Sequence, residues 1–289
     1  MMRQAYKQVP YGVSDFITVV TQNLYYVDKT MYIPQLEEEA RFLFFTRPRR
    51  FGKSLFINML RAYYDSSKKK DFQTLFGNLW IGKHPTPLQG AFQVLYLDFS
   101  QVGGSIDVVE DRFNEYCCIC LNDFMDSYGD AYPENMRRDF YESKSAGAKL
   151  AMLDKKAKAI GLPLYLIIDE YDNFTNTILN EKGEAVYHAI THADGFYRDF
   201  FKKFKGMFQR IFVTGVSPVT LNDVTSGSNL GWNISVKAEY NEMLGFSTED
   251  VRVMFNYYKE IGKMPAGCDV ESMINEMKPW YDNYCFAEG

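Results

Sequence analysis

Histidine is scarce in this chain, and cysteine occurs in a number that does not suggest pairing. The 289 residues include three histidines and five cysteines, and three of the cysteines are crowded at positions 117, 118 and 120. An odd, clustered set indicates neither a disulfide framework nor a zinc-binding pattern. The sequence therefore predicts buried thiols in a reducing compartment.

Long apolar runs and an excess of positive charge are also absent. No apolar run approaches the length of a membrane span, and residues 1–10 lack the apolar stretch of a secretory signal. The formal net charge is −5, which argues against a nucleic-acid binder without excluding a local basic patch. We expect a soluble, cytoplasmic protein with no membrane partner.

What the chain does contain is ample core-forming material in an alternating pattern. Hydrophobic residues make up 46% of it, enough for a large buried core. Short apolar runs predict strands, and amphipathic stretches between them predict helices. The expected strands are 42–46, 92–98, 164–168 and 210–214, and the expected helices are 54–64, 108–126 and 183–205.

This alternation predicts an α/β fold, a three-layer sandwich with a mainly parallel central sheet. From Ser247 onward the pattern is helical again, so we expect a domain over 1–245 and the start of a helical, lid-like region over 246–289. The loop punctuation at 226–229 predicts a flexible connection between the fourth strand and that region.

A phosphate-binding motif lies between the first strand and the first long helix. The general P-loop (Walker A) pattern is G-x-x-x-x-G-K-[ST], and Gly52, Lys53 and Ser54 match its end while Arg47 occupies the first glycine position. Lys53 is expected to bridge the β- and γ-phosphates, and the Ser54 hydroxyl to bind Mg²⁺. The segment expected to hold the nucleotide comprises Arg47, Pro48, Arg49, Arg50, Phe51, Gly52, Lys53, Ser54 and Leu55. Its arginines are expected to add positive charge to the loop.

The third apolar strand runs directly into acidic residues, as a Walker B motif requires. Asp169 is expected to hold Mg²⁺ and Glu170 to activate the attacking water as general base. Asp172 could assist, or be solvated at a helix start. At the end of the fourth strand, Thr214 or Ser217 is expected to sense the γ-phosphate. The alternative is that these hydroxyls only form hydrogen bonds with the nearby backbone.

The chain resembles the bacterial AAA-ATPase-like family. The matching segments are Tyr26-Val27-Asp28-Lys29-Thr30, Arg47 to Leu55, Ile168-Asp169-Glu170-Tyr171-Asp172, Thr214-Gly215-Val216-Ser217-Pro218, Ser226-Gly227 with Asn229, Gly245-Phe246, and Trp280-Tyr281-Asp282-Asn283-Tyr284 with Phe286. In that family an arginine, not a glycine, opens the loop, so Arg47 fits the resemblance.

The resemblance implies a P-loop NTPase fold that binds ATP and Mg²⁺. Hydrolysis driving a conformational change is the first expectation, with Glu170, Lys53 and Thr214 as catalytic residues and Ser54 and Asp169 at the metal. The alternative is an ATP-sensing module with little hydrolysis. Family members usually continue into a restriction-endonuclease-like nuclease domain, so the end at Gly289 suggests a fragment whose partner is an unknown protein or that domain. DNA-directed work rests on the resemblance alone.

Three further features carry open alternatives. The Asp28-Lys29 element either caps the nucleotide, with Lys29 near phosphate or Tyr26 near adenine, or forms a salt-bridged brace. Arg198 and Arg210 are either candidates for an arginine finger or ordinary surface arginines. The absence of a guanine-reading Asn-Lys-x-Asp element favours ATP over GTP, and the sequence selects no oligomeric state.

Overall fold

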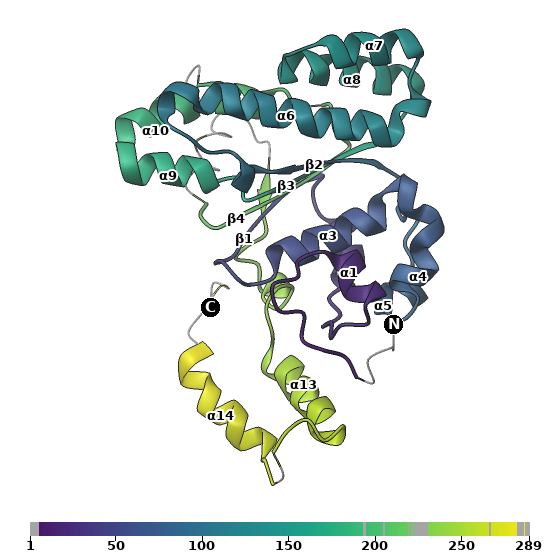
Figure 1. The fold of residues 1–289 in the computed structure, drawn as a ribbon, viewed down its shortest axis with the longest axis vertical. Coiled ribbons are helices and arrows are strands. Elements are labelled where there is room, and N and C mark those ends of the chain that lie inside the picture. The colour runs from purple at the N-terminus through teal and green to yellow at the C-terminus, as the bar shows by residue number, and fades with distance from the viewer. Residues whose placement is uncertain are drawn as a thin grey trace.

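A computed structural model describes residues 6–192, 195–204, 206–218, 220, 223, 231–265, 267–281 and 286. Its centre is a parallel sheet in the order β2-β3-β4-β1-β5 (Figure 1). The strands are β1 (Phe42–Thr46), β2 (Gln93–Asp98), β3 (Leu164–Asp169), β4 (Arg210–Gly215) and β5 (Trp232–Asn233). The predicted α/β sandwich with a parallel central sheet is therefore confirmed.

Alternate side chains of the strands feed two separate cores, one on each face of the sheet. On β3, Leu164, Leu166 and Ile168 enter one core, while Tyr165 and Ile167 enter the other. A strand buried on both faces needs apolar residues at every position, which is why these runs do not alternate with polar residues. This continuous apolar pattern made the four longer strands predictable to within a residue at either end.

Helices cover both faces of the sheet, as Figure 1 shows. The first core is closed by α6 (Ile106–Tyr128), α7 (Glu134–Glu142), α8 (Ala146–Ile160), α9 (Asn173–Lys182), α10 (Glu184–Thr191) and α11 (Phe196–Lys202). The second is closed by α1 (Phe16–Thr21), α2 (Tyr32–Glu38), α3 (Lys53–Tyr64), α4 (Phe72–Phe76) and α5 (Trp80–Lys83). Among the described helices, none is long and apolar enough to cross a bilayer.

One expectation about local structure is wrong, and one short element was not predicted. The single helix predicted over 183–205 is divided into α10 and α11, with Gly195 between them. A Cβ on Gly195 would lie 2.3 Å from the carbonyl oxygen of Ile190, so the turn needs glycine for close backbone contact. The short edge strand β5 was not predicted, because two residues carry no periodic signal. The loop expected at 226–229 lies outside the described residues.

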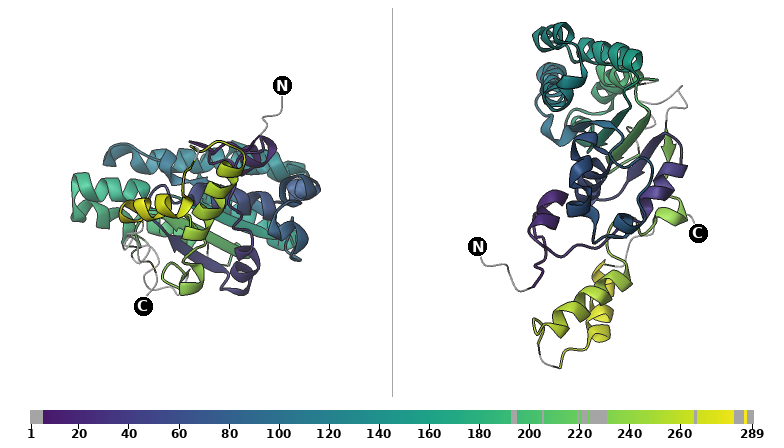
Figure 2. Two further views of the ribbon diagram at one scale, coloured as in Figure 1. Left: turned by 90° about the horizontal axis from the view of Figure 1, so that it is seen from below. Right: turned by 90° about the vertical axis from the view of Figure 1, so that its right-hand side faces the viewer.

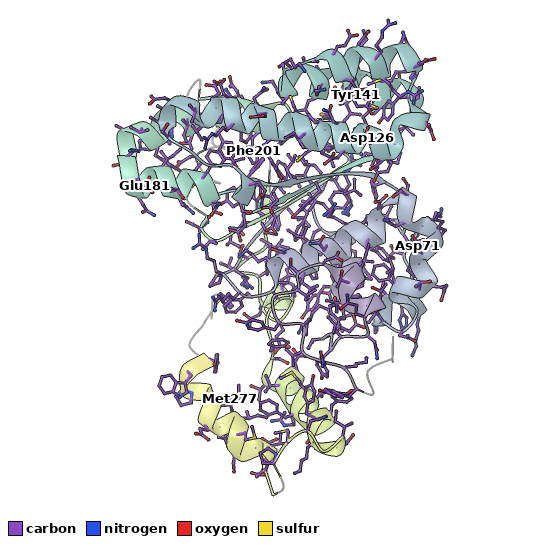
Figure 3. The ribbon with its side chains drawn as sticks, in the orientation of Figure 1. Asp71, Asp126, Tyr141, Glu181, Phe201 and Met277 are labelled. Atoms are coloured by element: carbon purple, nitrogen blue, oxygen red, sulfur yellow. The ribbon has the colours of Figure 1, made fainter. Side chains whose placement is uncertain are left out.

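The C-terminal helices stand apart from the sandwich. Helices α13 (Thr248–Glu260) and α14 (Val270–Tyr281) pack on each other below the sheet, as Figure 1 and the right-hand view of Figure 2 show. Ser247 starts α13 with a capping box in which its hydroxyl and the Asp250 carboxylate bond reciprocally to backbone N–H groups. In Figure 3, Met277 of α14 lies far from the side chains that fill the space between the sheet and its helices, such as Phe201.

Candidate functional site

The phosphate loop folds as a tight turn onto the N-terminus of α3. Gly52 is the N-cap residue with φ 86°, and Arg50 has φ 72°. The left-handed backbone at Gly52 is strained for other residues, which gives this motif position a physical reason. The backbone N–H of Arg47 donates to the carbonyl of Gly215 (3.2 Å), so the loop starts beside the end of β4. A turn of this kind before a helix N-terminus is suited to phosphate.

Asp169 joins three elements at the ends of the strands. Its side chain is 1% exposed. Oδ2 accepts a hydrogen bond from the Ser54 hydroxyl (2.7 Å), and Oδ1 accepts one from the Thr214 hydroxyl (2.8 Å). Burial raises the pKa of Asp169, and the hydrogen bonds from Ser54 and Thr214 oppose that shift. The three residues, predicted separately from distant segments, are thus in direct contact.

Lys53 and Glu170 form an ion pair beside this centre. Nζ of Lys53 lies 3.3 Å from Oε1 of Glu170, and it also donates to the carbonyls of Arg47 (3.1 Å) and Pro48 (3.2 Å). Glu170 has φ 49°, rare for a residue other than glycine and typical of constrained functional positions. Burial raises the pKa of Glu170, and the ammonium of Lys53 opposes the rise. The ammonium is therefore held at the loop, next to the proposed base.

Asp172 is neither solvated nor part of the ion pair. It is fully buried, and its carboxylate accepts hydrogen bonds from the backbone N–H groups of Val216 (3.1 Å) and Ser217 (2.6 Å). It also accepts from Nδ2 of Asn176 (2.9 Å). Gly215 must lack a side chain here, since a Cβ would lie 2.4 Å from Oδ1 of Asp172. Of the two alternatives for Asp172, the solvated helix start is therefore wrong, and the carboxylate fixes the segment after β4.

The Arg47 side chain turns into the protein. It is 2% exposed, and its guanidinium lies 4.2 Å from the ring centroids of both Phe45 and Phe286. It also donates to the carbonyls of Ser235 (2.8 Å) and Tyr240 (3.3 Å). The expectation that this arginine adds its charge to the phosphate loop does not match that placement, because the guanidinium is committed to carbonyls and rings behind the loop.

A cavity of about 660 Å³ opens beside the loop. Three parts of the chain line it: residues 9–14, 25–27 and Lys29; residues 49–56 with Glu170; and residues 244–246 with Met254. Its size is that of small-molecule sites. Seven of the nine predicted nucleotide-binding residues, from Arg49 to Leu55, line this cavity, while Pro48 contributes the carbonyl that Lys53 contacts.

Ser54 and Asp169 provide a donor set that fits Mg²⁺. Both contribute oxygen ligands, which this hard cation prefers, and their oxygens lie 2.7 Å apart. Mg²⁺ is commonly held by one or two protein oxygens while substrate phosphates and water complete its shell. Within the described ranges, no group of three or more His, Cys, Asp or Glu side chains forms a separate metal cluster.

The remaining sequence candidates lie elsewhere or have other partners. Arg210 is at the start of β4 and donates to the carbonyls of Leu36 and Glu37, at the opposite end of the strand from Thr214. Arg198 lies on α11 and lines none of the cavities described here. Lys29 forms an ion pair with Asp250 of α13 (2.7 Å), as the brace alternative expects, and it also lines the cavity.

Sequence reasoning missed one acidic residue next to this centre. Asp98 ends β2 and pairs in register with Asp169 on the neighbouring strand. Its charge adds to the upward shift in the pKa of Asp169. The available signal was an apolar strand that ends in aspartate, the same signal that identified Asp169.

Comparison with known proteins agrees with this geometry. A family profile described as "Predicted AAA-ATPase" matches residues 10–225, a range that contains Lys53, Asp169 and Thr214. A protein of Azotobacter chroococcum mcd 1, named "Uncharacterized protein in vnfD 5'region", is 27% identical over 290 residues. That similarity covers 96% of this chain and 48% of the relative, so the chain spans about half of the relative's length. Because the family profile covers most of the chain, this chain belongs to the AAA-ATPase-like family.

Proposed function

We propose that this chain binds ATP with Mg²⁺ in the cavity beside the phosphate loop and hydrolyses the β–γ bond. The observation that carries the proposal is the contact of Asp169 with both Ser54 and Thr214, next to the Lys53–Glu170 pair. Five polar residues, from the start of α3, the end of β3 with the residue that follows it, and β4, thus lie together beside the phosphate loop. The family membership supports ATP as the nucleotide.

The proposal gives each residue a role that its present contacts support. Lys53 exchanges its loop carbonyls for β- and γ-phosphate oxygens, while the loop N–H groups and the start of α3 stabilise negative charge. Ser54 and Asp169 would hold the metal ion, which would supply positive charge to neutralise the phosphates. Glu170 takes a proton from water as the water oxygen bonds to the γ-phosphorus and the bond to the β–γ bridging oxygen breaks. Thr214, bonded to Asp169, reports the state of this centre to β4.

Glu170→Gln tests the proposal. The amide retains the size of the side chain but cannot accept the proton, so we expect ATP affinity to persist while turnover falls by about 10²–10⁴-fold. Calorimetry gives the affinity, and steady-state phosphate release gives the turnover. Glu181→Gln, an exposed glutamate on α9 (Figure 3), is the matched control. Unchanged turnover in Glu170→Gln would remove Glu170 from its assigned role.

One observation favours a second function, an ATP-sensing module with little hydrolysis. Phe286, near the C-terminal end of the chain, packs on the Arg47 guanidinium and meets Phe51 edge-on at 5.4 Å between ring centroids. Through Phe286, a change in the conformation of the phosphate loop would be passed to the proposed C-terminal region, residues 246–289. Tight ATP binding by wild-type protein with no phosphate release would favour this function over hydrolysis.

A further inference from the structure

A second cavity, lined mainly by polar residues and called the polar cavity below, lies beside Glu170. Its volume is about 440 Å³, and α9 contributes Asn173, Asn176 and Asn180 to its lining. These positions are three and four residues apart, so the amides form one face of the helix. Asp172 bonds Asn176 and also the backbone after β4, so this wall is fixed relative to Thr214.

Arg49 and Glu170 line both this polar cavity and the nucleotide cavity. They therefore stand where the two spaces adjoin. Arg49 is also the one basic residue among the described residues that line the polar cavity. Its side chain is exposed, and Nη2 makes a long contact of 3.5 Å with Oδ1 of Asn173. A contact of that length is easily released, so the guanidinium is free to turn toward a phosphate.

The position of the γ-phosphate is marked by Lys53. Its ammonium contacts the carbonyl of Pro48 and the carboxylate of Glu170, and in this motif the lysine binds the β- and γ-phosphates. Arg49 directly follows Pro48 in the loop, so its side chain leaves the backbone next to that point. The other two arginines of the loop are placed differently from Arg49. Arg47 is buried behind the loop, and Arg50 lines the nucleotide cavity but not the polar cavity.

We propose that Arg49 is the arginine finger of this protein, supplied from its own phosphate loop, and that Asn173 is its positioning residue. The proposal rests on the hydrolysis proposed above. As the γ-phosphoryl group separates from ADP, negative charge grows on its oxygens and on the leaving oxygen. Arg49 donates to those oxygens from the boundary of the two cavities. Before the charge develops, the weak contact with Asn173 keeps the guanidinium near the boundary of the two cavities, and Arg49 leaves that contact as it turns toward the phosphate.

The test uses the whole chain and four variants: Arg49→Ala, Arg49→Lys, Asn173→Ala and Arg198→Ala. We expect Arg49→Ala to lower kcat about 100-fold or more with little change in ATP affinity. Lysine should restore only part of the rate, because it lacks the planar fork. Asn173→Ala should lower kcat less than Arg49→Ala and leave KM unchanged. Arg198→Ala should match wild type.

Two readouts separate charge stabilisation from a structural effect. Guanidinium at millimolar concentration should partly restore turnover to Arg49→Ala and not to Glu170→Gln. ADP with Mg²⁺ and aluminium fluoride, an analogue of the transferring phosphoryl group, should bind wild type more tightly than ADP alone, and Arg49→Ala should lose that difference while keeping its affinity for ADP.

The outcomes that contradict the proposal are distinct. Full turnover in Arg49→Ala with active wild type overturns the assignment and leaves hydrolysis standing. A large loss in Arg198→Ala instead transfers the role to α11. Wild type that neither releases phosphate nor binds the aluminium fluoride complex more tightly than ADP overturns hydrolysis, and the assignment of Arg49 with it.

Discussion

The strand-end centre, formed by Asp169, Thr214 and Asp172, is held very differently from the junction between the N-terminal segment and α13. The three side chains of the centre are at most 1% exposed and are bonded across β3, β4 and α3. At the junction, Lys29 and Asp250 have side chains 13% and 21% exposed, and α13 has no buried residue.

The junction is held by polar and aromatic contacts at the surface. The Tyr257 hydroxyl accepts from the backbone N–H of Lys7, and the Tyr258 hydroxyl donates to its carbonyl, each over 2.8 Å. The Tyr25 ring lies 5.6 Å and 5.8 Å from the rings of those two tyrosines, measured between centroids. Such contacts open at lower cost than a packed core. The strand-end centre thus lies on rigid strands, whereas the junction, which lines part of the cavity beside the phosphate loop, is weakly held.

The largest expected effect on stability is at the centre. Asp172→Ala removes the acceptor for the backbone N–H groups of Val216 and Ser217 and the partner of Asn176. Buried groups that lose an acceptor cost about 1–3 kcal/mol each, so we expect the free energy of unfolding to fall by about 3 kcal/mol. Urea unfolding measures it.

Asp139→Ala serves as the control for that measurement, since its side chain is 59% exposed on α7. It should change the unfolding free energy by no more than about 0.5 kcal/mol. If Asp172→Ala behaves like Asp139→Ala, the centre is not the rigid region that its hydrogen bonds indicate, and the contrast with the junction fails.

Sequence patterns predicted the centre much better than the junction. Strands buried on both faces leave apolar runs, and the loop motif and the acidic strand end are local in sequence. Lys53, Ser54 and Asp169 could therefore be named as candidates without the structure. Their meeting followed from the parallel topology, because the carboxyl ends of parallel strands share one edge. Asp98 also ends an apolar strand, so the same pattern could have predicted that it lies beside Asp169.

Contacts between residues far apart in sequence were not predictable. Lys29 meets Asp250 across 221 positions, and Arg47 meets Ser235 across 188. Neither residue type nor spacing identifies such a partner. The buried role of Asp172 was missed for a related reason. An acidic residue at a helix start is usually solvated, whereas this one binds the backbone N–H groups of Val216 and Ser217, far away in the sequence.

A smaller effect is expected at the junction. Lys29→Ala, Asp250→Ala and the double variant form a cycle that measures the coupling of the two charges. Because both side chains are partly exposed, we expect a coupling energy of no more than about 1 kcal/mol. ATP affinity should change in both single variants if the junction closes the cavity over nucleotide. If ATP affinity and turnover are unchanged in Lys29→Ala, the ion pair has only a structural role and Lys29 does not contribute to nucleotide binding.

The smallest expected effect is a shift in one titration. Burial raises the pKa of Asp250, but hydrogen bonds from Lys29 and Ser247 outweigh it and leave the pKa below its ordinary value of 3.8. A lowered carboxyl pKa stabilises the folded state above 3.8, and that contribution is lost as the pH falls through the folded pKa. Carbon-13 NMR of the Asp250 carboxyl should therefore give a midpoint below 3.8.

Lys29→Met is the matched variant for this titration, because it removes the ammonium and keeps most of the side-chain length. The Asp250 midpoint should move upward in it, since the hydrogen bonds within the capping box remain while that from Lys29 is lost. An identical midpoint in both proteins would mean that the ion pair is open in solution. The junction would then depend on its tyrosines, and it would be weaker still relative to the strand-end centre.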